Sequence, residues 1–213
     1  MYNNNNLAER GITMKRVLIH LILLGFCAPL SFGAFDYTIS TTYRYTTLTL
    51  NSNTLLVTGA GAYSIEAFGS SYIEVQNTAP LQQFVGGIYD LTLHDNSTMN
   101  FHAGEMGNFL IKDNASTVFR GGLINSIASY QYVYWLNGQP VDQHIEMIVK
   151  NYSYNTSTKK LTGTWADDTT FNIQLYNQTG YDTVINNIKF TIIPEPTTFT
   201  LLSLGGLVLR RKK

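Results

Sequence analysis

Residues 91–104, LTLHDNSTMNFHAG, recur eighteen positions later as residues 109–122, FLIKDNASTVFRGG. Identical residues occupy four equivalent positions: Asp95 and Asp113, Asn96 and Asn114, Phe101 and Phe119, and Gly104 and Gly122. A fainter copy lies at residues 65–75, and a longer insert around residues 76–90 separates it from the next copy. We therefore place repeats at residues 65–75, 91–108 and 109–126, and these repeats decide the fold.

Each repeat combines alternating apolar residues with a polar turn and a closing glycine. Alternation with a period of two predicts a β-strand, and the Asp-Asn pair predicts a turn. A unit this short cannot bury its own apolar face, so neighbouring units must stack. Stacking would bring Leu93 over Ile111 and Phe101 over Phe119 at a spacing of about 4.8 Å. We also expect the asparagines of equivalent turns to form an amide ladder.

These features predict an all-β protein whose residues 34–129 form a short parallel β-solenoid. The competing interpretation is an antiparallel meander in which two hairpins are similar by chance. Residues 130–193 change pattern: aromatic residues 132–136 precede the turn pair Asn137-Gly138, and further alternating segments follow. We expect antiparallel hairpins there that cap one end of the solenoid, while residues 38–57 cover the other end and protect its sheet edge.

The N-terminal segment, residues 1–33, has the pattern of a secretory leader. Met14-Lys15-Arg16 supplies a basic start, residues 17–24 supply an apolar middle, and Ser31-Phe32-Gly33 supplies small residues at a cleavage site. We predict cleavage between Gly33 and Ala34, and translation could begin at Met14 rather than Met1. The single cysteine, Cys27, lies in the leader, so the mature chain would have neither a disulfide nor a thiolate metal site.

The C-terminal segment, residues 194–213, has the pattern of a second targeting segment. It begins with Pro194-Glu195-Pro196, continues through an uncharged, largely apolar run at residues 197–209, and ends in four basic residues: Arg210, Arg211, Lys212 and Lys213. The prolines block a helix upstream, and the run predicts a short apolar helix that needs the basic residues to hold it in a bilayer. The basic residues favour the cytoplasmic side, so the preceding domain should lie outside.

This ordered set resembles the PEP-CTERM sorting signal of Gram-negative bacteria. The resemblance covers only about the last 20 residues. It implies recognition by an exosortase, removal of the tail, and delivery to the outer surface or the extracellular matrix. The partners implied are therefore the exosortase, the secretion machinery and, before processing, the membrane. A plain tail anchor or a buried apolar helix is the alternative.

Composition limits the classes of function that remain. The roughly 160 residues between the two targeting segments are enough for one domain with a hydrophobic core. They contain seven basic residues against twelve acidic ones, although the whole chain has a formal net charge of zero. A mildly acidic domain argues against binding to nucleic acid, which requires a basic face.

Candidate chemistry is sparse. His94, His102 and Glu105, with Asp95, could be recruited as metal ligands, but neither a His-Glu-x-x-His pattern nor a helix is present to align them. Asp90, Asp95 and Asp113 could act as acids, as aspartates do in β-helix pectinases. The equivalence of Asp95 and Asp113 in the repeat is explained more simply by a turn. We therefore predict no catalytic residues, no metal and no cofactor.

Aromatic residues crowd the second half of the domain, and aromatic rings can stack on sugars. Trp135 and Trp165 are the candidate glycan contacts, although strand aromatics more usually pack between hairpins. We expect an exported, non-catalytic protein of the cell surface or extracellular matrix. The alternatives are a module that binds extracellular polysaccharide or a β-helix enzyme acting on carbohydrate.

Overall fold

A computed structural model describes residues 34–82 and 86–194, and apart from Ala34 these belong to one compact unit, residues 35–213. The predicted leader, residues 1–33, and the predicted sorting helix after Pro194 lie outside the described residues. The expectation of an all-β protein is confirmed, because sixteen strands and one four-residue 3-10 helix make up the regular structure that is described. Over the described ranges, no helix has the length and apolar character needed to cross a bilayer.

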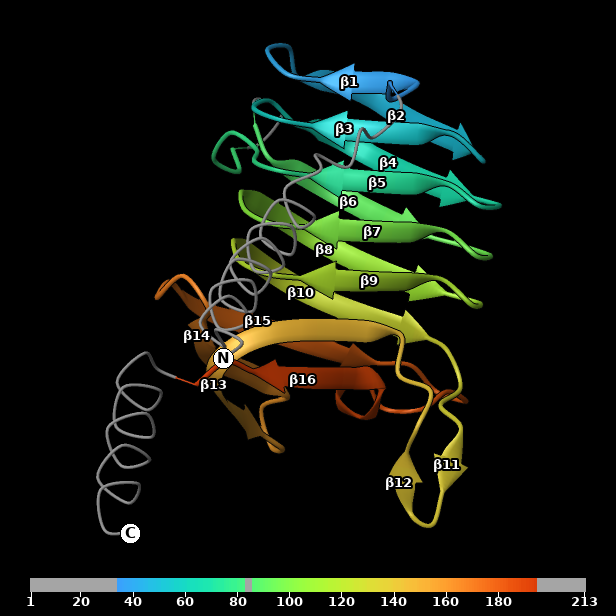
Figure 1. Ribbon diagram of the computed structural model, residues 1–213, viewed down its shortest axis with the longest axis vertical. Coiled ribbons are helices and arrows are strands. Elements are labelled where there is room, and N and C mark those ends of the chain that lie inside the picture. Colours follow the sequence, from blue (N-terminus) through green and yellow to red (C-terminus); the bar gives the residue numbers. More distant parts are fainter. Residues whose placement is uncertain (1–33, 83–85, 195–213) are drawn as a thin grey trace, which may run out of the picture. The chain divides into compact units, whose positions relative to one another are not determined.

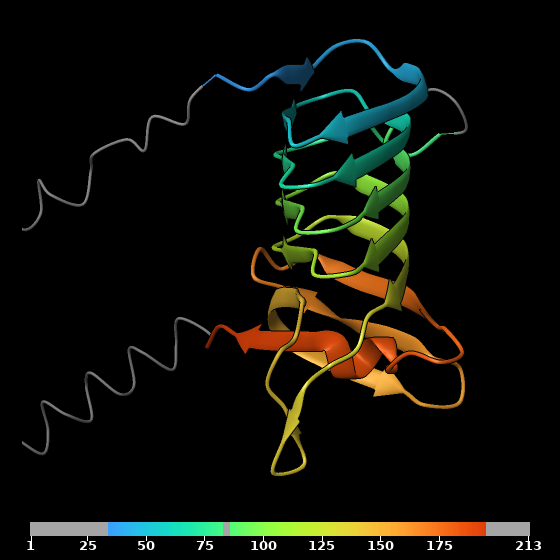
Figure 2. The same ribbon diagram turned by 90° about the vertical axis from the view of Figure 1, so that its right-hand side faces the viewer.

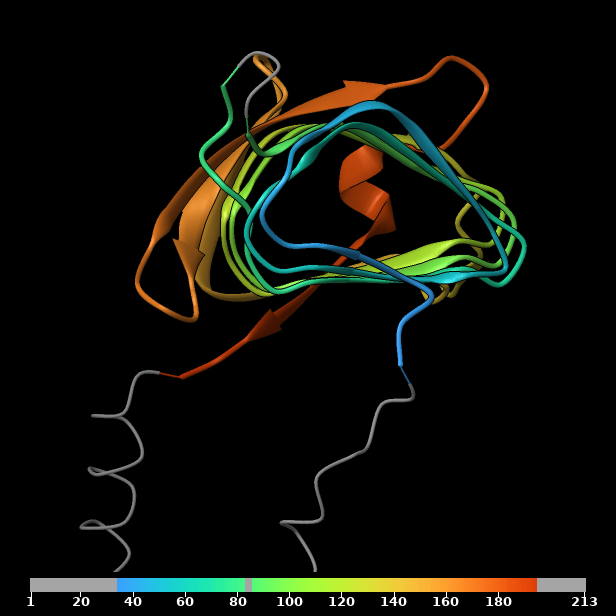
Figure 3. The same ribbon diagram turned by 90° about the horizontal axis from the view of Figure 1, so that it is seen from above.

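Two arms of parallel strands form most of the domain (Figure 1). The odd arm contains β1 (Tyr37–Ile39), β3 (Thr54–Val57), β5 (Tyr72–Val75), β7 (Thr98–Phe101) and β9 (Ser116–Phe119). The even arm contains β2 (Arg44–Asn51), β4 (Ala62–Phe68), β6 (Ile88–Leu93), β8 (Glu105–Lys112) and β10 (Leu123–Tyr130). The chain alternates between the arms, so one odd and one even strand make a rung. In Figure 3, seen from above, successive rungs lie over one another.

Every neighbouring pair within an arm is parallel, and the pairing follows the repeat, with one register shift between Arg44 and Thr47 where β2 pairs with β4. Leu93 pairs with Ile111, and Phe101 pairs with Phe119, as the repeat predicts. The fainter repeat joins the same register across its insert, because Ile65 pairs with Leu91. The sequence repeat is therefore a repeat of position as well as of residue type.

The core lies between the two arms. Alternate residues of each strand point inward and are buried, which the strand periodicity requires. Phe119 contacts two other rings, at 5.9 Å from Phe101 and 5.2 Å from Phe109, both edge to face. Such pairs stabilise a core beyond the area that they bury. The described core thus joins the two arms through interleaved side chains.

The turns from even to odd strands begin with a left-handed residue. Ser52, Gly69, Asp95 and Asp113 have φ angles of 58°, 65°, 56° and 55°. Asp95 Oδ2 accepts a hydrogen bond from the Gly69 backbone N–H at 2.8 Å, and Asp113 Oδ2 accepts one from the Asp95 N–H at 3.1 Å. The ladder at these turns is therefore built by aspartate carboxylates on backbone N–H groups, whereas an asparagine amide ladder was expected.

The glycines that close the repeats sit where the chain returns from the odd to the even arm. Gly122 has a φ of +84°, and a Cβ there would lie 2.6 Å from the Gly104 carbonyl oxygen. Gly104 has a φ of +103°, and its Cβ would lie 2.4 Å from the Thr78 nitrogen. Only glycine allows both the left-handed backbone and the close approach of neighbouring rungs.

Residues 130–193 differ from the separate antiparallel cap that the sequence suggested. They contain β11 (Trp135–Leu136), β12 (Gln139–Pro140), β13 (Ile145–Asn155), β14 (Lys160–Trp165), β15 (Thr170–Asn177), η1 (Val184–Asn187) and β16 (Ile188–Ile192). β13, β14 and β15 are antiparallel neighbours, as expected. However, β13 also pairs in parallel with β9 and β16, and β15 pairs in parallel with β10. The antiparallel strands thus join the two arms into one fourteen-stranded sheet (Figure 2).

The opposite end also differs from expectation. Residues 38–57 do not fold over the last rung as a cover. They form a rung of their own, because β2 pairs in parallel with β4 and β3 pairs in parallel with β5. β1 adds to β3 on the outer side. The sequence did not indicate this rung, because residues 38–57 are rich in Thr and Tyr and do not resemble the repeat.

Candidate functional site

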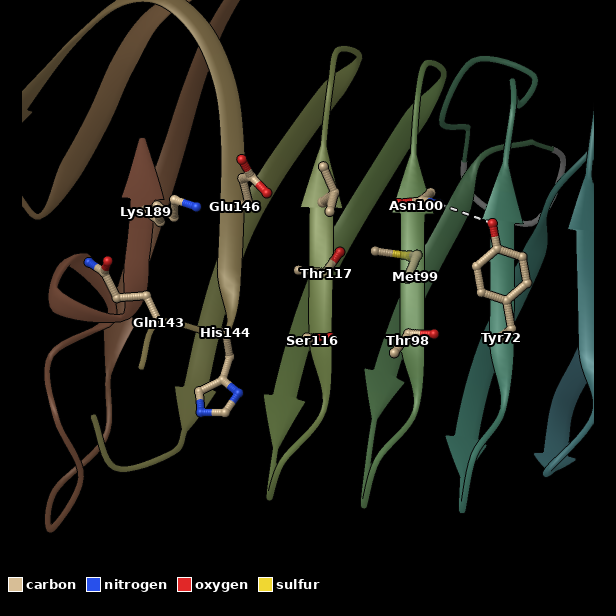
Figure 4. A pocket seen from close by; sticks show the side chains of 11 residues that line it. Tyr72, Thr98, Met99, Asn100, Ser116, Thr117, Gln143, His144, Glu146 and Lys189 are labelled. Atoms are coloured by element: carbon tan, nitrogen blue, oxygen red, sulfur yellow. Dashed lines mark hydrogen bonds between the residues drawn. The ribbon is translucent and has the colours of Figure 1, made fainter. Parts of the chain in front are cut away.

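A cleft of about 310 Å³ opens on the outer face of the odd arm (Figure 4). We call it the odd-face cleft. Its centre holds small side chains, Thr98 and Ser116, while larger side chains stand on both sides. The cleft is lined by residues of five strands and the segment before β13: Tyr72, Thr98, Met99, Asn100, Ser116, Thr117, Val118, Gln143, His144, Glu146 and Lys189.

On the β5 side, four polar side chains bind one another. Asn100 Nδ2 donates to Tyr72 Oη at 3.0 Å and to Glu74 Oε2 at 3.3 Å. The Tyr72 hydroxyl also donates to Glu74. His102 Nε2 lies 2.7 Å from Glu74 Oε1. Burial, followed by the hydrogen bond to Glu74, raises the pKa of Tyr72, so this phenol is neutral over the physiological range.

On the β13 side, the polar groups are held by the chain near η1. Thr191 Oγ1 donates to Glu146 Oε1 at 2.5 Å. Gln143 Nε2 donates to the carbonyl oxygens of Asn186 and Ile188 at 3.1 Å and 3.0 Å. In Figure 4, Glu146 and Lys189 lie on the neighbouring strands β13 and β16. This side of the cleft therefore presents fixed donors and acceptors.

The carboxylates on the two sides of the odd-face cleft are engaged in hydrogen bonds. Glu74, Asn100, Val118 and Glu146 are successive register partners on four adjacent strands. Three strand spacings put the backbones of Glu74 and Glu146 about 14 Å apart. Glu74 accepts a hydrogen bond from Tyr72, and Glu146 accepts one from Thr191. The cleft therefore offers polar groups on both sides to an extended polar ligand.

The even arm carries a second depression, of about 420 Å³, which we call the even-face trough. A chain of hydrogen bonds crosses its rungs: Ser126 Oγ donates to Asn108 Oδ1 at 2.8 Å, and Asn108 Nδ2 donates to Asp90 Oδ1 at 2.7 Å. The rings of Tyr63 and Tyr89 are stacked at 5.6 Å. The lining residues come from five strands and the following loop: Ser64, Glu66, Asp90, Leu91, Thr92, Asn108, Phe109, Leu110, Ser126, Ala128, Tyr130, Tyr176 and Gln178.

The considered metal ligands are not brought together. His94 stacks on Phe68 at 4.2 Å, and burial followed by the charge of Lys112 lowers the His94 pKa. His102 contacts Glu74, whereas Glu105 Oε2 accepts a hydrogen bond from the Leu81 N–H at 2.5 Å. Among residues 34–82 and 86–194, no group of three His, Cys, Asp or Glu could hold a metal ion.

The other predicted site residues are divided by burial. Trp165 is fully buried, and its indole Nε1 donates to the Gly122 carbonyl oxygen at 2.9 Å, so its prediction as a glycan contact is wrong. Trp135 is 42% exposed and remains available. Ala34 and Pro194, at the limits of the described residues, are exposed. Gly33, Glu195, Pro196 and the four terminal basic residues lie outside the described part of the chain.

Sequence reasoning missed the odd-face cleft. Tyr72 and Asn100, which line it, and Glu74, which binds both, meet across the insert around residues 76–90, which interrupts the eighteen-residue step. Alternation indicates which residues share a face of one strand, but it could not bring these three together. Comparisons with protein-family models, with curated proteins and with solved structures find no match for this chain. The resemblance to PEP-CTERM proteins therefore rests on the C-terminal motif alone and stays a prediction.

Proposed function

We propose that this chain is an exported, non-catalytic protein of the cell envelope or extracellular matrix, built as a short parallel β-solenoid. The leader at residues 1–33 directs export, and the segment at residues 194–213 is the sorting signal that an exosortase recognises and removes. The mature region, residues 34–193, is then a rigid scaffold on the outer surface of a Gram-negative bacterium.

One observation carries the scaffold proposal: the repeat carboxylates are engaged in structure. Asp95 and Asp113, the candidate acids of the enzyme alternative, accept backbone N–H bonds from the turn of the preceding rung. Their left-handed backbone suits a turn residue of this type. A carboxylate that joins consecutive rungs supports a rod-like module, because each rung fixes the next.

The sorting proposal is tested by replacing Pro194-Glu195-Pro196 with three alanines in the native host. We expect the variant to retain its tail and to accumulate in the membrane fraction, while the wild-type chain loses the tail and reaches the surface. The mature N-terminus, read by mass spectrometry, should be Ala34. A control variant, Ile193→Ala, changes a neighbouring residue outside the motif and should be processed normally. Unchanged processing of the triple variant would contradict the proposal.

Polysaccharide binding is the second candidate function, and the even-face trough favours it. The trough combines carboxylate, amide and hydroxyl groups with aromatic rings nearby, which is the chemistry that sugars require. Its lining comes from five adjacent strands, so it would suit a linear polymer that crosses the rungs. Asn108 is the central group, because it both donates and accepts in the Asp90–Ser126 chain.

Affinity electrophoresis against a panel of bacterial polysaccharides tests this candidate. We expect a retarded wild-type band, and loss of retardation in Asn108→Ala. Asn172→Ala, an exposed position on β15, is the matched control. A panel that retards no band would remove the candidate, and released reducing sugars that depend on Asp95 or Asp113 would favour the enzyme alternative instead.

A further inference from the structure

The segment between β10 and β13 forms a projecting hairpin that the fold itself does not use. We call residues 131–143 the aromatic hairpin; it contains β11 and β12. Figures 1 and 2 both show it extending beyond β13 and β16, at the end of the stack where the sheet is joined. The two strands are only two residues each and pair with each other alone.

The aromatic hairpin exposes an unusual amount of apolar surface. Tyr132, Tyr134, Trp135, Leu136 and Val141 are 71%, 63%, 42%, 52% and 51% exposed. Residues 131–141 contain no charged side chain. A concentrated apolar surface of this kind marks an interaction site more often than chance exposure does.

The aromatic hairpin is also held in shape. Val133 is buried, and its backbone N–H donates to Asp182 Oδ2 at 2.8 Å. The rings of Tyr132 and Tyr181 lie 5.1 Å apart, which fixes the base of the hairpin. At the tip, Asn137 and Gly138 have positive φ angles of 51° and 76°, as a two-residue hairpin turn requires. The apolar side chains are therefore displayed on an organised turn.

The chemistry of this surface matches the interface of a lipid bilayer. Tyrosine and tryptophan combine an apolar ring with a polar group and concentrate where lipid headgroups meet hydrocarbon. A glycan site is usually concave with converging polar groups, whereas this hairpin projects outward and offers mainly rings and aliphatic groups. Because residues 131–141 carry no charge of their own, this surface suits a zwitterionic lipid better than a strongly anionic one.

The chain beyond the described residues supplies the second observation. β16 ends at Ile192, and both Ile192 and Ile193 are exposed. The uncharged run at residues 197–209 and the basic residues after it follow within a few positions. β16 pairs in parallel with β13, so the aromatic hairpin, which precedes Ile145, and the chain's exit after Ile192 lie at opposite ends of these two strands. Both nevertheless belong to the last layer of the stack (Figure 1). A run held in a membrane would therefore bring this end of the domain toward the bilayer.

We propose that the aromatic hairpin inserts its tip, with Trp135, into the interfacial layer of the membrane while the C-terminal run is engaged there. This inference rests on the membrane-bound stage of the proposed export route. The two contacts would orient the domain and present Pro194 at a fixed height for processing. Membrane attachment would then have two points rather than one.

The two tryptophans provide the experiment. Trp165→Phe leaves Trp135 as the single reporter in the full chain, and Trp135→Phe leaves the buried Trp165 as the matched control. Each variant is mixed with phosphatidylcholine vesicles with or without brominated acyl chains. We expect Trp135 emission to shift to the blue and to fall at least about twofold with brominated lipid, while Trp165 emission is unchanged. Vesicle-bound chains whose Trp135 is unquenched by bromine and still open to acrylamide would overturn the proposal.

A second variant set does not depend on replacing Trp165. Tyr134→Ser, Leu136→Ser and Val141→Ser together should weaken vesicle binding about tenfold or more, because exposed apolar area no longer leaves water. Tyr45→Ser, an exposed tyrosine on β2, should leave binding unchanged. Protection of Trp135 from acrylamide by soluble polysaccharide, without quenching by lipid, would assign the hairpin to a glycan instead. Failed tail processing in cells would leave these vesicle results unaffected, so the two proposals fail separately.

Discussion

The two ends of the stack differ in how their strand edges are covered. At the end formed by β13, β14 and β15, antiparallel strands connect the odd arm to the even arm, and Trp165 packs against Phe171 at 4.5 Å beneath them. At the end formed by β1 and β2, each strand pairs on one side only within the described residues. One end is therefore closed by long-range pairing, and the other keeps strand edges.

The two ends also differ in the hydrogen bonding of particular buried polar groups. Near the closed end, Asn187 is fully buried: its Nδ2 donates to Ser129 Oγ at 3.0 Å and Gln131 Oε1 at 2.5 Å, and its Oδ1 accepts from the His144 N–H at 2.8 Å. Near the open end, the hydroxyl of Tyr43 is buried and has no hydrogen-bond partner among the described residues. The Thr117 hydroxyl, on β9 beside β13, is also buried without such a partner, so the difference between the ends rests on the Asn187 network and on the closing strands. We expect the closed end to be the more costly end to disturb.

The largest effect should come from Trp165→Ala. The change creates a cavity under the closing strands and leaves the Gly122 carbonyl oxygen without its donor, which should lower the free energy of unfolding by about 3–5 kcal/mol. Chemical denaturation of the purified chain measures it. Trp135→Ala, on the exposed hairpin, is the control and should change stability by less than about 0.5 kcal/mol. Equal losses in both variants would contradict the importance of the closure.

Asn187→Ala should have the next largest effect. It removes the partner of the His144 N–H and leaves Gln131 Oε1 with only the long 3.5 Å bond from Ser129 Oγ, which we expect to cost about 2–3 kcal/mol. The adjacent Asn186→Ala is the matched control, because the described contacts of Asn186 are made by its backbone. The comparison of the ends is weakened if Asn187→Ala is no worse than Asn186→Ala in thermal unfolding.

Tyr43→Phe should act in the opposite direction. Removing a buried hydroxyl without a partner should leave stability unchanged or raise it by up to about 1 kcal/mol. Tyr45→Phe, in which the hydroxyl belongs to an exposed ring, should have no measurable effect. A clear loss of stability in Tyr43→Phe would show that the open end is better satisfied than the described contacts indicate.

Sequence reasoning reached the parts of this fold that repeat. The sequence showed the equivalence of Asp95 with Asp113 and of Gly104 with Gly122. Each pair occupies the same connection between strands in successive rungs, and that connection requires a positive φ angle. The sequence did not show that β13, β14 and β15 join the two arms. The contact between Trp165 and Gly122 spans 43 residues, and alternation does not indicate which strand a segment will pair with. For the same reason the sequence left Trp165 as a candidate glycan contact beside the alternative of packing between hairpins, and the odd-face cleft was not foreseen.

The smallest effect concerns the open end and depends on pH. Asp36 Oδ2 accepts hydrogen bonds from the Thr54 N–H at 2.7 Å and from Thr54 Oγ1 at 3.0 Å, which fix the segment before β1 against β3. These bonds, the backbone one first, lower the pKa of the exposed Asp36. A carboxyl with a lowered pKa stabilises the fold above the ordinary value of about 3.9, and this contribution is lost as the pH falls below that value toward the lowered one.

We therefore expect the open end to loosen first in acid. The amide signal of Thr54, followed by NMR as the pH is lowered, should titrate with a midpoint below the ordinary aspartate value, and Asp36→Asn should remove this titration. Amide signals of the closed end, such as His144, should stay unchanged over the same step because a neutral amide, Asn187, accepts that bond. A Thr54 signal that titrates at the ordinary aspartate pKa would mean that the Asp36 contact does not hold the open end. A wild-type signal that does not titrate at all would lead to the same conclusion.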